Sequence, residues 1–350
     1  MIDYKQLPEF DNHKQVVPIN DRFGDLIGFI AIHDTTLGPS TGGTRYWFYD
    51  SPEKALKEAL RLSKAMTYKC ALAGVPYGGG KAVIIANSHW PKTKELWEDY
   101  TAVVNSLEGT FTTGEDMGID ADDIKAMHAL SPYVLGVTCG ELAPWTAMGV
   151  FLSIQEGLKT IFGSKKINGR SFAVKGLGKV GIALCQKLLE EGGKIIAADI
   201  NENVCKNIIK TMPGIKIVPV KEIHRQKVDV FSPCANGGDL NDHTISELDC
   251  KIVCGGANNQ LESVNAGKIL LQRGILYIPD YVANAGGLIN IVGEREKNGY
   301  DPDLVRRKIE DIPQTVASII NLSATLHLPP GEIADNLARE KLQNIENQKK

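Results

Sequence analysis

The stretch that most constrains the fold is SFAVKGLGKVGIALCQKLLEEGGKIIAADI, residues 171–200. Its pattern predicts a buried strand, a glycine turn, an amphipathic helix and a second strand that ends at Asp199. Gly176, Gly178 and Gly181 follow the spacing G-x-G-x-x-G. In this context the first glycine allows a tight turn, the second admits a pyrophosphate, and the third lets the helix pack on the strand. The stretch therefore predicts a dinucleotide-binding strand–helix–strand unit.

The ends of the helix and of the second strand indicate which dinucleotide binds. At the start of the helix, unpaired backbone N–H groups and the positive end of the dipole attract phosphate. Asp199 stands about 20 residues beyond the first glycine, where a carboxylate binds both ribose hydroxyls and repels an added 2′-phosphate. A chance glycine turn in an α/β domain is the alternative, and the surrounding strands and helix disfavour it. We predict NAD, rather than NADP, bound by Gly176, Gly178, Lys179, Val180, Gly181 and Asp199.

Further strand–helix alternation extends this unit along the second half of the chain. Apolar strands are expected at residues 229–234, 251–258 and 275–280, with a helix at residues 262–274. Alternation of this kind predicts a parallel sheet covered by helices on both faces. We therefore expect a doubly wound Rossmann dinucleotide-binding domain over residues 141–328.

The first part of the chain has a different pattern and predicts a separate α/β domain over residues 1–140. Two strands are expected within residues 14–34, and an amphipathic helix is expected from Ser51 to about Cys70. The length of 350 residues is consistent with two domains. The end of the chain is predicted to be helical, with residues 329–350 returning to the first domain.

A lysine at the start of an apolar segment raises a chemical question. In AGVPYGGGKAVIIA, residues 73–86, three glycines precede Lys81, where we expect a strand to begin. A cation that enters a hydrophobic interior is costly unless its charge is used or lost. A phosphate-binding loop is rejected because Val75 replaces its first glycine and Ala82 replaces its Ser/Thr. Two interpretations stay open: a tight turn with a lysine that extends to solvent, or a lysine with a chemical role.

Composition excludes several classes of function. A net charge of −3 gives no electrostatic reason to expect a nucleic-acid or membrane partner. No apolar run approaches the roughly 20 residues of a membrane span, and the charged N-terminus lacks a secretion signal. The seven cysteines, an odd number, predict free thiols in the cytoplasm. The seven histidines are isolated, so no metal site is expected.

Several ordered motifs resemble a known family. They are TGGTR at 41–45, MTYK at 66–69, GGGK at 78–81, GED at 114–116, GANNQ at 256–260 and PDYVANAGG at 279–287. With the glycine turn, they resemble the glutamate/leucine/phenylalanine/valine dehydrogenase family, most closely the branch that acts on apolar amino acids. The resemblance covers nearly the whole chain. It implies an N-terminal α/β substrate domain, a Rossmann domain and an interdomain cleft that closes over the substrate.

The resemblance also implies an activity, which is the NAD-dependent reversible oxidative deamination of an apolar L-amino acid to its 2-oxo acid and ammonia. Family members usually assemble, so a homo-oligomer is expected. By family position, Lys81 is the catalytic lysine, Asp116 is the acid/base, and Lys69 with Gly42 and Gly43 binds the substrate carboxylate. Asn259 is the contact of the substrate amino group, and Asn258 lies near the nicotinamide.

The chemistry of lysine supports the role that the resemblance assigns to Lys81. A general base must be neutral near the working pH, whereas free lysine titrates near ~10.4. Burial beside the glycines and repulsion from the Lys69 ammonium would both lower the pKa of Lys81. Asp116 would shuttle the proton.

The side-chain pocket implied by the resemblance carries no charge. By family position it is lined by Thr41, Gly114, Leu288 and Ile291, so an acidic substrate side chain would be left unpaired. Gly114 is smaller than the alanine typical of leucine-type enzymes and is similar to aromatic-specific members, whereas Leu288 and Ile291 fill space. Because one methyl group is worth only about 1–3 kcal/mol in such a pocket, leucine, valine, phenylalanine and tryptophan are not distinguished.

The chain departs from the family pattern at four places. The segment 136–150 is shorter than expected of leucine-type members and contains Trp145. Gly255 and Gly256 stand where Gly-Ala-Ala is commoner. Thr41 replaces an apolar pocket residue. Asn236 replaces an apolar residue after Cys234 and Ala235, three residues expected on the nicotinamide side of the cofactor.

Two other functions remain open at this point. A homologue from specialised metabolism would make the 2-oxo acid of an aromatic amino acid such as tryptophan or phenylalanine, and Gly114 motivates this alternative. A catalytically silent NAD-binding regulatory protein is the other, and retention of Lys69, Lys81 and Asp116 argues against it.

Overall fold

The structure is a computed structural model that describes residues 2–86 and 91–349. The chain divides into two compact units. The first unit consists of Met1–Gly140, Ile291–Asp301 and Ala338–Lys350. The second unit consists of Glu141–Asn290 and Pro302–Leu337. The chain therefore leaves the first unit twice, after Gly140 and after Asp301, and returns to it twice, at Ile291 and at Ala338.

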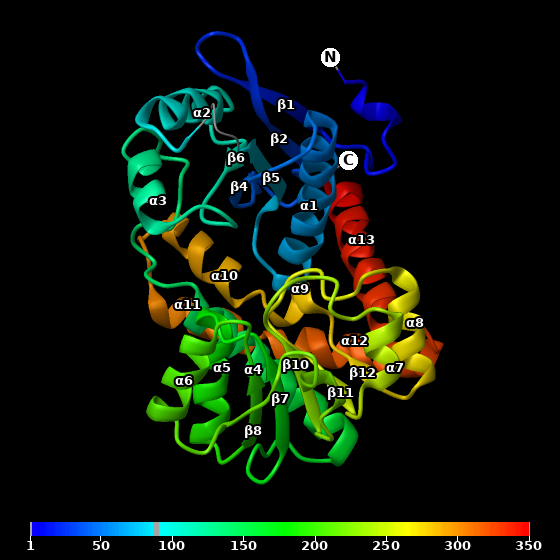
Figure 1. Cartoon of the computed structure of the whole chain (residues 1–350). Coiled ribbons are helices and arrows are strands. Elements are labelled where there is room, and N and C mark those ends of the chain that lie inside the picture. The colour runs from blue at the N-terminus through cyan, green and yellow to red at the C-terminus, as the bar shows by residue number, and fades with distance from the viewer. Residues whose placement is uncertain (1, 87–90, 350) are drawn as a thin grey trace. The chain divides into compact units, whose positions relative to one another are not determined.

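A mixed sheet forms the centre of the first unit (Figure 1). Its strands follow the order β1-β2-β5-β3-β6, and β4 also pairs with β5. The bounds are β1 Gln15–Asn20, β2 Leu26–Asp34, β3 Ser40–Thr41, β4 Thr44–Trp47, β5 Gly78–Ile85 and β6 Phe111–Thr112. The pairing of β1 with β2 is antiparallel, which confirms the two strands predicted within residues 14–34.

Helix α1, Pro52–Ala73, packs on this sheet and has clear end signals. The hydroxyl of Ser51 accepts a hydrogen bond from the backbone N–H of Lys54, as expected of an N-cap. The predicted end near Cys70 was one turn too early, because the helix continues until Gly74 adopts a left-handed conformation with φ 68°. The other helices of this unit before residue 140 are α2 Lys94–Ser106, α3 Ala121–His128 and the short 3-10 helix Tyr4–Gln6.

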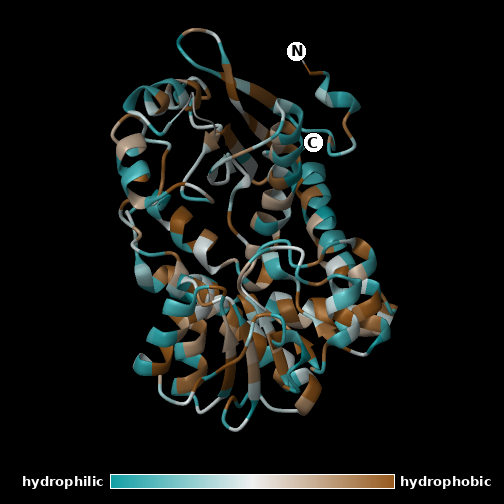
Figure 2. Ribbon diagram, in the orientation of Figure 1, coloured by the Kyte–Doolittle hydropathy of each residue, from teal (hydrophilic) through white to brown (hydrophobic). Residues whose placement is uncertain are grey.

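Alternation along the strands divides the core of the first unit into two layers. Ile30, Ala82 and Ile84 lie in a cluster with residues of α2 and α3, whereas Ala31 and Val83 lie in a cluster with residues of α1. Since successive strand residues point to opposite faces, helices cover the sheet on both sides. Figure 2 shows the strands β1 and β2 as largely hydrophobic.

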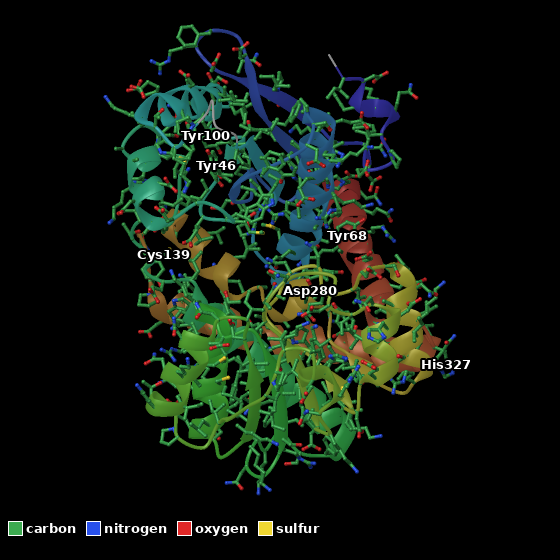
Figure 3. All side chains as sticks on the ribbon, in the orientation of Figure 1. Tyr46, Tyr68, Tyr100, Cys139, Asp280 and His327 are labelled. Atoms are coloured by element: carbon green, nitrogen blue, oxygen red, sulfur yellow. The ribbon has the colours of Figure 1, made fainter. Side chains whose placement is uncertain are left out.

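The C-terminal helix α13, Pro330–Lys349, runs beside α1 (Figure 1). Tyr68, labelled in Figure 3, accepts a hydrogen bond of 3.0 Å from Nε of Arg339. Nζ of Lys341 donates to the carbonyl oxygen of Ala71 at 2.8 Å. These contacts fasten the end of the chain to the last turns of α1.

Six parallel strands form the sheet of the second unit, in the order β12-β11-β10-β7-β8-β9. Their bounds are β7 Ser171–Lys175, β8 Lys194–Ala198, β9 Lys216–Ile217, β10 Val230–Pro233, β11 Ile252–Val253 and β12 Leu276–Tyr277. Renumbered from β7, this is the doubly wound order 3-2-1-4-5-6 read from its other end. The predicted Rossmann topology and the α/β fold class are confirmed.

Helices alternate with these strands. The bounds are α4 Ala143–Phe162, α5 Lys179–Glu190, α6 Glu202–Thr211, α7 Asp242–Glu247, α8 Val264–Gln272 and α9 Asp280–Ala283, with α10 Gly286–Val292, α11 Pro302–Glu310 and α12 Ile312–Leu326 later. Two 3-10 helices occupy Ile223–Arg225 and Gly293–Arg295. The predicted helical tail is confirmed, with short breaks between α11, α12 and α13. Within residues 2–86 and 91–349, no helix is both long and apolar enough to span a membrane.

Candidate active site

Strand alternation decides where Lys81 points. In β5, Val83 packs with α1, and Lys81 is two residues away on the same side of the strand. The lysine therefore faces α1 from a strand whose residues are all buried. Its own side chain is only 7% exposed. The prediction that the strand begins at Lys81 was wrong, because β5 already begins at Gly78.

The three glycines before Lys81 are strand residues rather than a turn, so the alternative of a tight turn is wrong. A Cβ at Gly79 would overlap the backbone and hydroxyl of Thr67 on α1, and one at Gly80 would lie 2.7 Å from the ring of Phe111. The contacts at Gly79 would be 2.2 Å long, and Cβ atoms in real structures do not come closer than about 3.0 Å to other atoms. The glycines thus let α1 and Phe111 approach the strand closely, and this approach explains why glycine is needed.

The Lys81 ammonium forms a buried ion pair with Oδ2 of Asp116. The same carboxylate oxygen lies 3.3 Å from Nε of Arg45 on β4. Arg45 in turn pairs through Nη1 with Oε1 of Glu58 on α1. Two cations and two carboxylates from four segments of the chain therefore form one cluster in the first unit.

This environment shifts the pKa values of both members of the pair. Burial lowers the pKa of the Lys81 ammonium, Asp116 opposes that shift, and the Arg45 guanidinium adds to it. Burial acts to raise the pKa of Asp116, but Lys81 and Arg45 outweigh it and hold that pKa at about 2. The carboxylate is thus ionised at any working pH, and the lysine loses its proton more readily than a free lysine.

The predicted carboxylate-binding glycines lie directly against this cluster. A Cβ at Gly43 would lie 2.5 Å from the carbonyl oxygen of Glu115 and 2.9 Å from Cβ of Asp116. A Cβ at Gly42 would overlap the carbonyl of Gly80, next to Lys81. The Gly42-Gly43 segment therefore packs against both the strand of Lys81 and the loop of Asp116. Thr41, the last residue of β3, is buried.

Lys69 lies near the end of α1 and is half-buried. Gly42 is close to the same helix, because a Cβ there would lie 3.4 Å from Cγ of Met66. The convergence of the Lys69 and Lys81 ammonium groups stays a prediction. The Arg45 guanidinium, which the sequence-based argument did not include, lowers the pKa of Lys81, and the repulsion attributed to Lys69 stays a prediction.

The predicted pocket residues divide between the two units. A Cβ at Gly114 would lie 2.5 Å from Cδ1 of Ile291, so the isoleucine occupies the space that the missing methyl group leaves. The membership of Gly114 and Ile291 in the substrate pocket stays a prediction. Leu288 lies on the same helix as Ile291, α10; it is buried and belongs to the second unit.

The glycine turn of the second unit has the geometry of a dinucleotide site. Gly176 has φ 100°, and a Cβ at Gly181 would overlap the carbonyl oxygen of Gly176. A Cβ at Gly178 would meet no atom within 4 Å. Oδ2 of Asp199 accepts a hydrogen bond of 2.6 Å from the backbone N–H of Leu177, which ties the acidic residue to the turn. Lys179 and Val180 begin α5, as predicted.

Two loops from neighbouring strands pack on this turn. A Cβ at Gly176 would lie 2.8 Å from Cβ of Ala235, and Sγ of Cys234 accepts a hydrogen bond of 3.4 Å from Gly256 N–H. A Cβ at Gly256 would lie 2.5 Å from Cγ1 of Val180. At the glycine that departs from the family pattern, Val180 therefore occupies the space of an alanine methyl group.

Asn258 and Asn259 are held by residues from the PDYVANAGG motif. The backbone N–H of Asn259 donates to Oδ2 of Asp280 at 2.5 Å, and Nδ2 of Asn284 donates to Oδ1 of Asn258 at 2.8 Å. Asp280, labelled in Figure 3, also accepts from the hydroxyl of Tyr277 at 2.9 Å. Asn259 has φ 53°, a left-handed conformation that is uncommon outside glycine and that these bonds stabilise.

The exposed loop of Asn236 lies next to this pair, because the backbone N–H of Gly238 donates to the carbonyl oxygen of Asn259 at 2.8 Å. The structure thus brings the predicted cofactor residues of the second unit together at the carboxyl ends of β7, β8, β10 and β11. Their roles in binding stay a prediction.

Sequence reasoning missed Arg45, Glu58, Asp280 and Asn284 as members of these clusters. Arg45 and the two residues of the PDYVANAGG motif stood inside motifs that were recognised, but no role followed from their spacing. A buried arginine must be paired, so the position of Arg45 in the TGGTR motif was a usable signal. Glu58 stands on an ordinary helix face and gave no signal.

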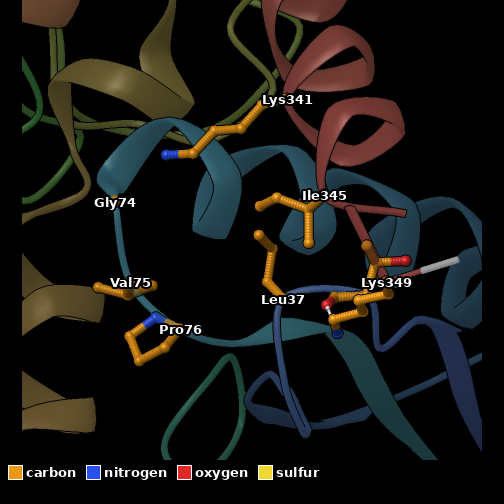
Figure 4. A pocket seen from close by; sticks show the side chains of 8 residues that line it. Leu37, Gly74, Val75, Pro76, Lys341, Ile345 and Lys349 are labelled. Atoms are coloured by element: carbon orange, nitrogen blue, oxygen red, sulfur yellow. Dashed lines mark hydrogen bonds between the residues drawn. The ribbon is translucent and has the colours of Figure 1, made fainter. Parts of the chain in front are cut away.

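A separate shallow pocket of about 280 Å³ lies between α13 and the turn after α1 (Figure 4). Its lining includes Leu37, Val75, Pro76 and Ile345 but none of the predicted site residues. The ammonium of Lys349 at its rim donates to the carbonyl oxygen of Thr36 at 2.6 Å. Among the described residues, no group of three or more His, Cys, Asp or Glu side chains could hold a metal ion.

Comparison with known proteins identifies the family. Residues 13–131 match the domain described as Glu/Leu/Phe/Val dehydrogenase, dimerisation domain. Residues 143–207 and 198–320 match the domain described as Glutamate/Leucine/Phenylalanine/Valine dehydrogenase. The chain belongs to the glutamate/leucine/phenylalanine/valine dehydrogenase family. The resemblance predicted from the motifs is therefore confirmed, and the protein is an enzyme of the oxidoreductase class that uses a nicotinamide dinucleotide, NAD or NADP.

Relatives in this family cover nearly the whole chain. Leucine dehydrogenase of Geobacillus stearothermophilus is 38% identical over 347 residues, which are 98% of this chain and 94% of the relative. L-tryptophan dehydrogenase of Nostoc punctiforme is 42% identical over 340 residues, 96% of this chain and 95% of the relative. The crystal structure of L-tryptophan dehydrogenase from Nostoc punctiforme has a TM-score of 0.84 and 40% identity, covering 96% of this chain and 97% of that chain.

Proposed function

We propose that the protein catalyses the reversible oxidative deamination of an apolar L-amino acid, with NAD as the hydride acceptor. The products are the 2-oxo acid, ammonia, NADH and a proton. The observation that carries this proposal is the buried pair of Lys81 and Asp116, in which the lysine has a lowered pKa and the carboxylate remains ionised. A pair in this state can accept and return protons at the attacking water and at the substrate nitrogen.

The residues of the second unit fit a dinucleotide. The space around Gly178 at the start of α5 is open, so a pyrophosphate can approach the backbone N–H groups there. No side chain caps this helix end. Oδ1 of Asp199 accepts from the backbone N–H of Asn201 at 2.8 Å, and Oδ2 accepts from Leu177, so the carboxylate is held beside the turn. A fixed negative charge there favours NAD over NADP.

In the proposed mechanism, the Lys69 ammonium and the backbone around Gly42 and Gly43 bind the substrate carboxylate. Bound NAD⁺ supplies the hydride acceptor for the substrate Cα. Neutral Lys81 then takes a proton from the water that adds to the iminium carbon. Asp116 exchanges a proton with the substrate nitrogen, so that ammonia can leave. The direct contact between Lys81 and Asp116 lets the pair pass the proton within the site.

The test is Lys81→Ala, with Lys81→Met as a second variant that keeps most of the side-chain volume. We expect kcat for oxidation of the best apolar amino acid to fall by roughly 10²–10⁴-fold, since general acid–base catalysis contributes about that much. NAD binding, measured by titration, should remain close to wild type. Lys125→Ala is the matched control, because Lys125 is an exposed lysine of the same unit. Comparable turnover in Lys81→Ala would remove Lys81 from the mechanism.

An aromatic amino acid is the second candidate substrate, because the relative with 42% identity is an L-tryptophan dehydrogenase. The filling of the space at Gly114 by Ile291 argues for a pocket no larger than that of a leucine-type enzyme. Comparison of kcat/KM for leucine, valine, phenylalanine and tryptophan, followed by NADH absorbance, would distinguish the two. A silent regulatory homologue would instead bind NAD and turn over none of them.

We also propose that the protein self-associates and acts in the cytoplasm. The matched domain over residues 13–131 is named a dimerisation domain, which supports assembly of identical chains. Light scattering on the purified protein would give the mass of the assembly, and a mass near 38.1 kDa would refute self-association.

A further inference from the structure

Arg45 occupies an unusual place, between two carboxylates inside the first unit. Its side chain is 10% exposed and projects from β4, next to the strand of Lys81. Nε lies 3.3 Å from Oδ2 of Asp116, and Nη1 pairs with Oε1 of Glu58. A buried guanidinium retains its charge under all working conditions, so this cation is a permanent feature of the site.

The groups around Arg45 come from every element packed against it. Helix α1 contributes Glu58 and, behind it, Arg61, whose Nη2 lies 2.8 Å from Oε2 of Glu58 and whose side chain is 45% exposed. Strand β5 contributes Lys81, and the loop after β6 contributes Asp116. The segment after β4 contributes Tyr49, which stays neutral because burial and the Glu58 carboxylate raise its pKa to about 12.

The position of Arg45 matters for the proton that Lys81 must release in the proposed mechanism. Lys81 must lose its proton, yet a lysine whose only charged neighbour is a carboxylate holds its proton more tightly. Oδ2 of Asp116 accepts both Lys81 Nζ and Arg45 Nε, so the carboxylate keeps a cation beside it when the lysine becomes neutral.

We propose that Arg45 is a positioning residue that holds Asp116 in place and supplies the permanent positive charge that lets Lys81 release its proton. Glu58 orients the guanidinium and moderates its effect. The Arg45 charge lowers the pKa of Lys81, whereas the Glu58 charge raises it, so the two residues act in opposite directions. This inference rests on the proposed function, because it assumes that neutral Lys81 is the working base.

Two charge-removing variants test it by the sign of their effect. In oxidative deamination, kcat/KM should rise with pH as Lys81 becomes neutral. Arg45→Gln should move this acidic limb to higher pH by about 1 unit, the lower end of the effect of a charge within ~4–6 Å. Glu58→Gln should move it to lower pH. A purely structural role predicts a loss of kcat in both variants without opposite displacements.

Two further variants serve as controls. Arg61→Gln removes a cation that also touches Glu58 but is exposed and has no contact with Asp116, so its limb should stay at the wild-type position. Arg45→Lys keeps the charge but not the planar fork that bridges two carboxylates. It should retain the position of the limb with a lower kcat.

The outcomes separate this inference from the proposed function. Limbs displaced in opposite directions by Arg45→Gln and Glu58→Gln, with Arg61→Gln unchanged, support the inference. Unchanged limbs, or limbs displaced in the same direction, overturn it even where Lys81→Ala is inactive. Full turnover in Lys81→Ala instead overturns the proposed function itself. If Arg45→Gln does not fold, the direction of the Glu58→Gln limb decides alone, and a limb that stays or moves upward refutes the inference.

Discussion

Two glycines of the same turn should respond in opposite ways to the same added methyl group. A Cβ at Gly178 meets no atom within 4 Å, and the backbone there, with φ −72° and ψ −173°, is accessible to alanine. A Cβ at Gly181 would lie 1.9 Å from the carbonyl oxygen of Gly176, about 1 Å closer than the 3.0 Å limit for Cβ atoms. Gly178→Ala should therefore affect binding, and Gly181→Ala should affect folding.

The magnitudes follow from these contacts. At Gly181 the backbone must move, and overpacking of this kind costs about 1–3 kcal/mol. At Gly178 the free energy of unfolding should change by less than about 0.5 kcal/mol, or rise by about 0.4–1 kcal/mol because alanine restricts the unfolded chain. The Gly178 methyl group would occupy the space of the approaching pyrophosphate. A loss of about 1–3 kcal/mol there corresponds to roughly 5- to 150-fold weaker NADH binding.

Two measurements on the ligand-free proteins and one with cofactor check this reasoning. Urea and thermal unfolding should show a lowered midpoint for Gly181→Ala and an unchanged or raised one for Gly178→Ala. NADH fluorescence titration should show weakened binding by Gly178→Ala. The reasoning fails if Gly178→Ala is destabilised as much as Gly181→Ala, or if it binds NADH as tightly as the wild type.

Two further predictions concern charge. Asp199→Asn keeps an acceptor for the Leu177 N–H but removes the negative charge, so kcat/KM for NAD should fall relative to that for NADP; an unchanged ratio would refute the assignment. Burial lowers the pKa of His33 to about 4, so the folded protein binds this proton later than the unfolded chain, whose histidine titrates near ~6.5. Stability should thus fall as the pH drops from about 6.5 toward 4, by on the order of 1–2 kcal/mol between pH 7 and pH 5. When the free energy of unfolding is measured by urea titration at several pH values, His33→Asn should lose this part of the pH dependence. A pH dependence equal to that of the wild type would contradict the prediction.

Patterns within short segments predicted much of the fold. The strand, glycine turn, helix and strand from Ser171 to Ala198 were predicted in order, because their hydrogen bonds and packing involve residues close along the chain. The start of α1 next to Ser51 was predicted for a similarly local reason, because Pro52 suits the first turn of a helix. Lys81 and Asp116 were selected as reactive partners by the resemblance, and the structure brings them into contact.

The charges around that pair were not predictable from spacing. Arg45 contacts Asp116 across 71 positions of sequence, and Glu58 reaches Arg45 from a helix face with no distinguishing pattern. The sequence-based argument named Lys69 as the source of repulsion on Lys81, because the helix of Lys69 was expected to end near the strand of Lys81, and it did not include Arg45. Electrostatic interactions depend on distance in space, and only the sheet register and the packing of α1 determine that distance.

The glycines also show which features the sequence determines and which depend on the tertiary structure. The amino-acid sequence alone determined that a βαβ dinucleotide unit follows a separate α/β domain and that Lys81 precedes an apolar strand. Only the tertiary structure decided that Gly79 makes room for α1, that Gly256 makes room for Val180, and that Ile291 fills the space at Gly114. A glycine in a sequence indicates that a side chain is absent, and the neighbour that uses the space belongs to another part of the folded chain.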